Sequence, residues 1–97
     1  LPGPRTRRAI LEIHLKRREV DPDSLPLGKL AEVTRGFSGA ELEHLVVSAL
    51  YLAHAEGAAL GGQHLAREVK ATRPLSVMRA EDIEALRAWA RERAVSA

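Results

Sequence analysis

The chain has 97 residues, enough for one domain with a core, and its net charge of +2 gives little reason to expect a nucleic-acid partner. It has no cysteine, which excludes disulfides and thiolate metal sites and fits a reducing compartment such as the cytoplasm. Three aromatic residues are too few for a stacking platform, and no window approaches the ~20 apolar residues of a membrane span.

The apolar residues are mostly leucine and alanine, which favours helices over strands. Their spacing predicts an all-α fold, a small bundle of four to five helices. We expect a proline-containing connector at 1–4 and one helical domain at 5–97. The predicted helices span 5–19, 26–34, 39–56, 63–72 and 79–95. The helix at 39–56 is apolar over most of its circumference, which predicts the central position in the bundle.

A helix end followed at once by a helix start is predicted in the segment 34–42. Gly36 suits the left-handed position that follows a helix. Ser38 can cap the next helix, and Glu41 completes a capping box with it. Phe37 and Leu42 occupy the two positions of a hydrophobic staple.

The first turn of the helix at 39–56 offers a candidate ligand contact. Gly39 brings no side chain, so free backbone N–H groups there can approach a ligand closely. The alternative is that Gly39 and Ala40 serve only close helix packing.

The segment Thr34–Leu42 resembles the T-x-G-[FY]-S-G-A-[DE]-L segment in the helical lid of AAA ATPases. The opening of the chain, with Leu1, Pro2, Arg8 and the Ile10–His14 run, is similar to the lid's L-P-x-x-x-x-R-x-x-I-L-x-x-H pattern. Leu27, Leu30 and Ala31 lie where the family has L-x-x-L-A. The fold implied is the AAA lid type.

The end of the chain resembles one bacterial and plastid-type branch of the family. Its pattern T-x-P-L-S…I-x-x-L-R-x-W-A-x-x-R is similar to Thr72–Ser76 followed by Ile83–Arg93. This branch is the subfamily that the resemblance indicates.

The resemblance implies that the cofactor is ATP, with magnesium held by a separate large domain. It places Gly39 and Ala40 near the adenine and ribose, and His14 against the base or ribose. The sequence has neither G-x-x-x-x-G-K-[ST] nor a Walker B strand, so we expect no ATP hydrolysis by this chain alone. The implied partners are its own large ATPase domain, neighbouring subunits of a hexameric ring and a protein substrate that the sequence does not identify.

Other interpretations remain open. His14 can instead be a half-buried histidine on a helix face. The chain can be a stand-alone helical interaction module that uses the surface around Trp89. The basic clusters at 5–8 and 16–18 are typical of solvated faces or of partners for the dipole at a helix C-terminus, with a subunit interface as the functional alternative. His44, His54 and His64 show no spacing typical of a metal site.

Overall fold

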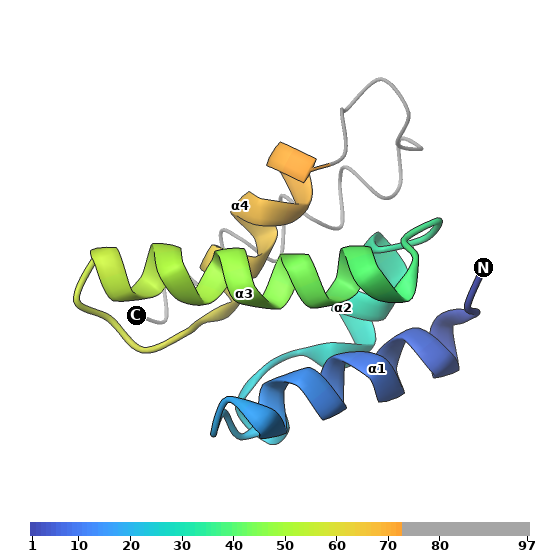
Figure 1. Ribbon diagram of the computed structural model, residues 1–97, viewed down its shortest axis with the longest axis horizontal. Helices are drawn as coiled ribbons and strands as arrows, with labels where there is room; N and C mark the ends of the chain where they lie inside the picture. The colour runs from blue at the N-terminus through green and yellow to red at the C-terminus, as the bar shows by residue number, and fades with distance from the viewer. Residues whose placement is uncertain (73–97) are drawn as a thin grey trace.

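The computed structural model describes residues 1–72, and within that range every regular element is helical (Figure 1). The all-α prediction is therefore confirmed. The elements are α1 (Pro4–Arg17), the 3₁₀ turn η1 (Pro22–Ser24), α2 (Leu27–Val33), α3 (Gly39–Ala55) and α4 (Gly62–Thr72). The predicted helix at 79–95, with Trp89, lies outside the described residues. The division into a connector at 1–4 and a lid at 5–97 stays a prediction, although Pro4 already belongs to α1.

The helix α3 lies at the centre, as its apolar circumference predicts. It packs against α1 on one side and against α4 on another, while α2 packs mainly against α1 (Figure 1). Its buried residues are Leu42, Leu45, Val46, Ala49 and Ala53. They join leucines from α1, α2 and α4 in one core that includes Leu11, Leu15, Leu30 and Leu65.

The junction between α2 and α3 has the predicted form. Gly36 adopts a φ of 87°, in the left-handed region that glycine tolerates. The hydroxyl of Ser38 accepts from the N–H of Glu41 at 3.2 Å, and the Glu41 carboxylate accepts from the N–H of Ser38 at 2.8 Å. This capping box fixes the residue at which α3 begins.

The helices α1 and α3 end in the same hydrogen-bond pattern. At the end of α1 the N–H of Val20 donates to the Leu15 carbonyl, and at the end of α3 the N–H of Ala58 donates to the Ala53 carbonyl. Both are Schellman motifs, in which the residue after the cap is left-handed. That residue is Gly57 in α3, at φ 68°, whereas in α1 it is Glu19, at φ 60°.

The end of α1 therefore differs from the prediction. The spacing of apolar residues extended this helix to Glu19, but it ends two residues earlier, at Arg17. No glycine marks the end, and a left-handed glutamate is a rare way to close a helix.

The basic cluster at the start of α1 contains a buried arginine. Only 4% of Arg7 is exposed, and its Nε and Nη2 donate to the Ala31 carbonyl at 2.9 and 2.6 Å. Its Nη1 donates to the Pro2 carbonyl at 2.9 Å. Since Ala31 lies in the last turn of α2, the guanidinium caps that helix end. The interpretation of this cluster as a solvated face is wrong for Arg7.

Candidate functional site: the face between α1 and α3

The helices α1 and α3 lie side by side and run in the same direction (Figure 1). Successive turns of α1 lie beside successive turns of α3. Ile10 lies next to Gly39, and His14 in the following turn faces Glu43. Arg18, in the turn after that, lines a groove with Val47. All three predicted site residues therefore lie on these two neighbouring helices.

Gly39 is the first residue of α3, and the structure tests whether packing requires a glycine there. Among residues 1–72, an added Cβ would meet nothing closer than Cδ1 of Ile10 at 4.0 Å, which is ordinary van der Waals contact. Packing within this part of the chain therefore does not require a glycine at this position.

The backbone N–H groups of Gly39 and Ala40 point out of the first turn of α3, as at any helix start. Neither group has a hydrogen-bond acceptor among residues 1–72. Ala40 is exposed and Gly39 is partly exposed. These two donors, together with the positive end of the helix dipole, are accessible to a ligand.

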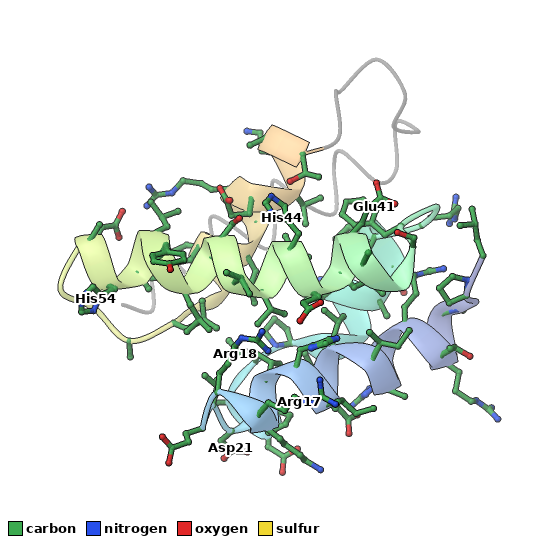
Figure 2. The ribbon with its side chains drawn as sticks, viewed as in Figure 1. Arg17, Arg18, Asp21, Glu41, His44 and His54 are labelled. Atoms are coloured by element: carbon green, nitrogen blue, oxygen red, sulfur yellow. The ribbon has the colours of Figure 1, made fainter. Side chains whose placement is uncertain are left out.

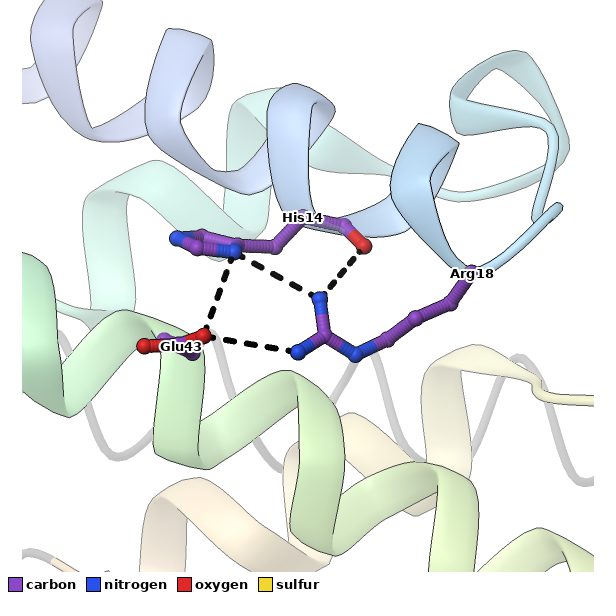
Figure 3. A network of polar contacts seen from close by, with 3 residues as sticks. All are labelled: His14, Arg18 and Glu43. Atoms are coloured by element: carbon purple, nitrogen blue, oxygen red, sulfur yellow. Dashed lines mark hydrogen bonds and ion pairs between the residues drawn. The ribbon is translucent and has the colours of Figure 1, made fainter.

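His14 belongs to a polar network between α1 and α3 (Figure 3). Arg18 donates through Nη1 to the backbone carbonyl of His14 at 2.9 Å and lies 3.5 Å from its Nδ1. Through Nη2 the same guanidinium donates to Oε2 of Glu43 at 3.4 Å. That carboxylate oxygen is 3.8 Å from Nδ1 of His14. One edge of the imidazole thus faces an arginine and a glutamate.

The other ring nitrogen of His14, Nε2, has no partner within residues 1–72. Only 13% of the side chain is exposed, so the ring is mostly covered. The half-buried position that the sequence left open is therefore what the structure shows, and a free ring nitrogen comes with it.

A shallow groove of about 390 Å³ continues from this network toward the end of α3. It is lined by Arg18, Val47, Leu50, Tyr51 and His54. Arg18 reaches from α1 toward α3, whereas Glu41 and His44 extend from the side of α3 that faces away from α1 (Figure 2).

The comparisons with known proteins agree with this architecture. The family model described as AAA+ lid domain matches residues 24–65, a range that includes Gly39 and Ala40 but not His14. This segment is an AAA+ lid domain. No solved structure matches the chain with significance.

Three curated relatives show where such lids occur. The ATP-dependent zinc metalloprotease FtsH of Paraburkholderia phymatum is 44% identical over 62 residues, 61% of this chain and 10% of that protein. The proteasome-activating nucleotidase of Saccharolobus islandicus is 39% identical over 57 residues, 59% of this chain and 14% of the relative. The uncharacterized AAA domain-containing protein ycf46 of Pyropia yezoensis is 29% identical over 91 residues, 93% of this chain and 18% of the relative. The chain thus spans less than a fifth of each of these relatives.

The remaining histidines of the lid play other parts. His64 is fully buried and holds the turn between α3 and α4. Its Nδ1 accepts from the N–H of Gly61 at 2.9 Å, so the proton is on Nε2, which donates to Oε1 of Glu56 at 3.0 Å. Within the described part of the chain, the polar partner of His44 is the Ser48 hydroxyl on its own helix, at 3.3 Å. Within residues 1–72 no three potential ligands gather as a metal site would require, and no helix in that range is long and apolar enough to cross a membrane.

The hydrogen bond from His64, with the nearby Arg67 guanidinium, holds the pKa of the Glu56 carboxyl below its ordinary value. Arg67 lies 2.9 Å from Oε2 of Glu56, but both side chains are well exposed, so the ion pair contributes little. This cluster therefore serves the α3–α4 turn.

The sequence did not predict the contacts of Arg18 and Glu43 with His14. Arg18 follows His14 by four residues, a spacing that puts both on one face of a helix end, and that signal was present in the sequence. Glu43 is 25 residues from Arg18 along the chain, so only the parallel packing of α1 and α3 reveals its part.

Proposed function

We propose that this lid forms the adenine and ribose side of an ATP site and couples ATP hydrolysis to motion between domains and between subunits. Gly39 and Ala40 at the start of α3 and His14 on α1 would contact the nucleotide. The phosphates and the magnesium ion would be held by a separate large domain, because the sequence contains no P-loop.

One observation carries this proposal. The parallel packing of α1 and α3 puts on one face two unpaired N–H donors, a glycine that internal packing does not require and a histidine with a free Nε2. Such a face can approach a flat, polar ligand closely. The family match over Gly39 and Ala40 supports the same assignment.

The partners in this proposal are the lid's own large ATPase domain, neighbouring subunits of a hexameric ring, and a protein substrate. ATP-dependence and nucleotidase activity in the names of two relatives support ATP use by the whole protein. The alignment with ycf46 over 93% of the chain supports membership of the bacterial and plastid-type branch that the end of the sequence resembles. The cytoplasmic location stays part of the proposal.

The proposal is tested by giving Gly39 a large side chain in the whole protein. Gly39→Leu should weaken nucleotide binding by about tenfold, since the new side chain occupies the space that the base or ribose would use. Binding is measured by titration of a fluorescent ATP analogue, and turnover by phosphate release.

Gly28→Leu is the matched control. Gly28 also lies in the first turn of a helix, is exposed, and has only the flexible Arg8 guanidinium near its Cβ position, at 3.8 Å. If both variants bind and hydrolyse ATP like the unmodified protein, the lid does not contribute to the nucleotide site at Gly39.

A further inference from the structure

The polar network around His14 does more than join two helices. Two contacts converge on Nδ1 of the imidazole, from the Arg18 guanidinium and the Glu43 carboxylate, and a third joins those two groups to each other (Figure 3). The Nε2 edge has no partner among the described residues. The two nitrogens of this ring are therefore in different environments within the described residues.

We propose that Arg18 and Glu43 are positioning residues that hold His14 with Nδ1 as a hydrogen-bond acceptor and with Nε2–H directed at an acceptor atom of the nucleotide's base or ribose. The inference rests on the function proposed above, and it assigns a part to two residues outside the motif that suggested that function.

The position of Arg18 is determined by the end of α1. His14 lies in the last turn of this helix, where carbonyl groups lack a donor partner within the helix. The amide of Arg18, which would normally bond to the His14 carbonyl, instead donates to the Leu15 carbonyl at 3.0 Å. The Arg18 side chain replaces that bond through Nη1, at 2.9 Å. The guanidinium is thereby fixed beside the imidazole of the same residue.

The tautomer follows from the chemistry of the guanidinium. Arginine can only donate hydrogen bonds, so the ring nitrogen facing it, 3.5 Å away, is best left unprotonated. The Glu43 oxygen is further from Nδ1, at 3.8 Å, and is engaged by Nη2 of the same arginine at 3.4 Å. Glu43 thus orients Arg18, and the single ring proton is on Nε2.

A donor at Nε2 determines which ligand atoms His14 can recognise. The ring nitrogens of adenine and the oxygens of ribose are acceptors, so Nε2–H can bond to them directly. A histidine with the other tautomer would present a lone pair to the adenine ring nitrogens and repel them. Arg18 and Glu43 therefore affect nucleotide affinity without touching the nucleotide.

The first test is the tautomer of His14 in the nucleotide-free chain, read from the nitrogen chemical shifts of the ring at neutral pH. We expect proton on Nε2 in the unmodified chain, and a mixture of tautomers in Arg18→Met, which keeps the aliphatic stem. Arg17→Met is the matched control, because Arg17 is an exposed neighbour with no polar partner within residues 1–72. A proton on Nδ1 in the unmodified chain, or an unchanged tautomer in Arg18→Met, overturns the inference.

The second test is nucleotide affinity in the whole protein. Arg18→Met should weaken binding about three- to tenfold and Glu43→Gln about two- to threefold, while Arg18→Lys recovers part of the loss and Arg17→Met changes nothing. His14→Ala separates the two proposals. If His14→Ala weakens binding but Arg18→Met does not, the positioning inference is wrong and the nucleotide contact stands. If His14→Ala leaves affinity unchanged, the nucleotide contact by His14 is wrong, whatever the tautomer.

Discussion

The ends of α1 and α3 share one backbone motif, but they differ in the residue at the left-handed position and in the hydrogen bonds of the nearby histidine. At the end of α3 the left-handed position is a glycine, and the nearby His64 is fully buried with both ring nitrogens bonded. At the end of α1 that position is Glu19, and one ring nitrogen of the nearby His14 has no partner within residues 1–72. The end of α3, with Gly57 and His64, has the features of a structural joint. The end of α1 retains backbone strain and an unused donor, as sites that bind ligands often do.

The largest expected effect is on the structural joint. His64→Ala removes a buried ring, leaves a cavity and deprives the Gly61 N–H of its acceptor, so we expect a loss of about 2–4 kcal/mol of unfolding free energy. His14→Ala should cost less than about 1 kcal/mol, because its carbonyl bond to Arg18 survives and the ring has no polar contact closer than 3.5 Å within residues 1–72. Urea unfolding followed by circular dichroism measures both. Equal losses would contradict the distinction between the two histidines.

Substitution of the two left-handed residues should change the stability of the chain in opposite directions. Gly57→Ala is expected to destabilise the chain by about 1 kcal/mol, a purely backbone cost, because an added Cβ would meet nothing within 4 Å. Glu19→Gly is expected to stabilise it by about 0.5–1 kcal/mol, since glycine relieves the strain at φ 60°. Thermal unfolding of the two variants and of the double variant measures the effects, which should add because the sites are separate. A destabilising Glu19→Gly would mean that the glutamate side chain stabilises the end of α1.

The smallest effect concerns pH. The pKa of Glu56 is lowered in the folded chain, chiefly by the hydrogen bond from His64, so the unfolded chain binds the proton more readily. The stabilisation is complete at neutral pH and is lost as the pH falls below the ordinary pKa of a glutamate and through the lowered pKa of Glu56. Glu56→Gln should therefore reduce the fall in stability over that range, measured as the urea midpoint at each pH.

Glu32→Gln is the control for this prediction. Glu32 is an exposed carboxylate on α2 and forms no ion pair within residues 1–72. If the two variants change the acid dependence equally, the effect is one of net charge and not of the bond between Glu56 and His64.

The sequence predicted what depends on neighbours along the chain. The capping box of Ser38 and Glu41, the turn at Gly36 and the central position of α3 follow from local spacing, and all of them are confirmed. The lid assignment also came from a contiguous motif, and the family match confirms it. The parts assigned to His14, Gly39 and Ala40 stay predictions.

The features that the sequence did not predict depend on pairs of residues that come together only in the fold. Arg7 belongs to a basic run, and nothing in its sequence context shows that a carbonyl 24 residues away will bury its guanidinium. The anchoring of His64 by Glu56 and Gly61 needs the conformation of the intervening loop. The end of α1 was placed two residues late, because no glycine marks it.

The guanidinium of Arg7 has a mechanical consequence. One of its nitrogens donates to the carbonyl of Pro2, and two others donate to the carbonyl of Ala31 in the last turn of α2. The Arg7 side chain is buried from water. Because the same guanidinium bonds to both carbonyls, Pro2 cannot be displaced from α2 without breaking or moving these hydrogen bonds.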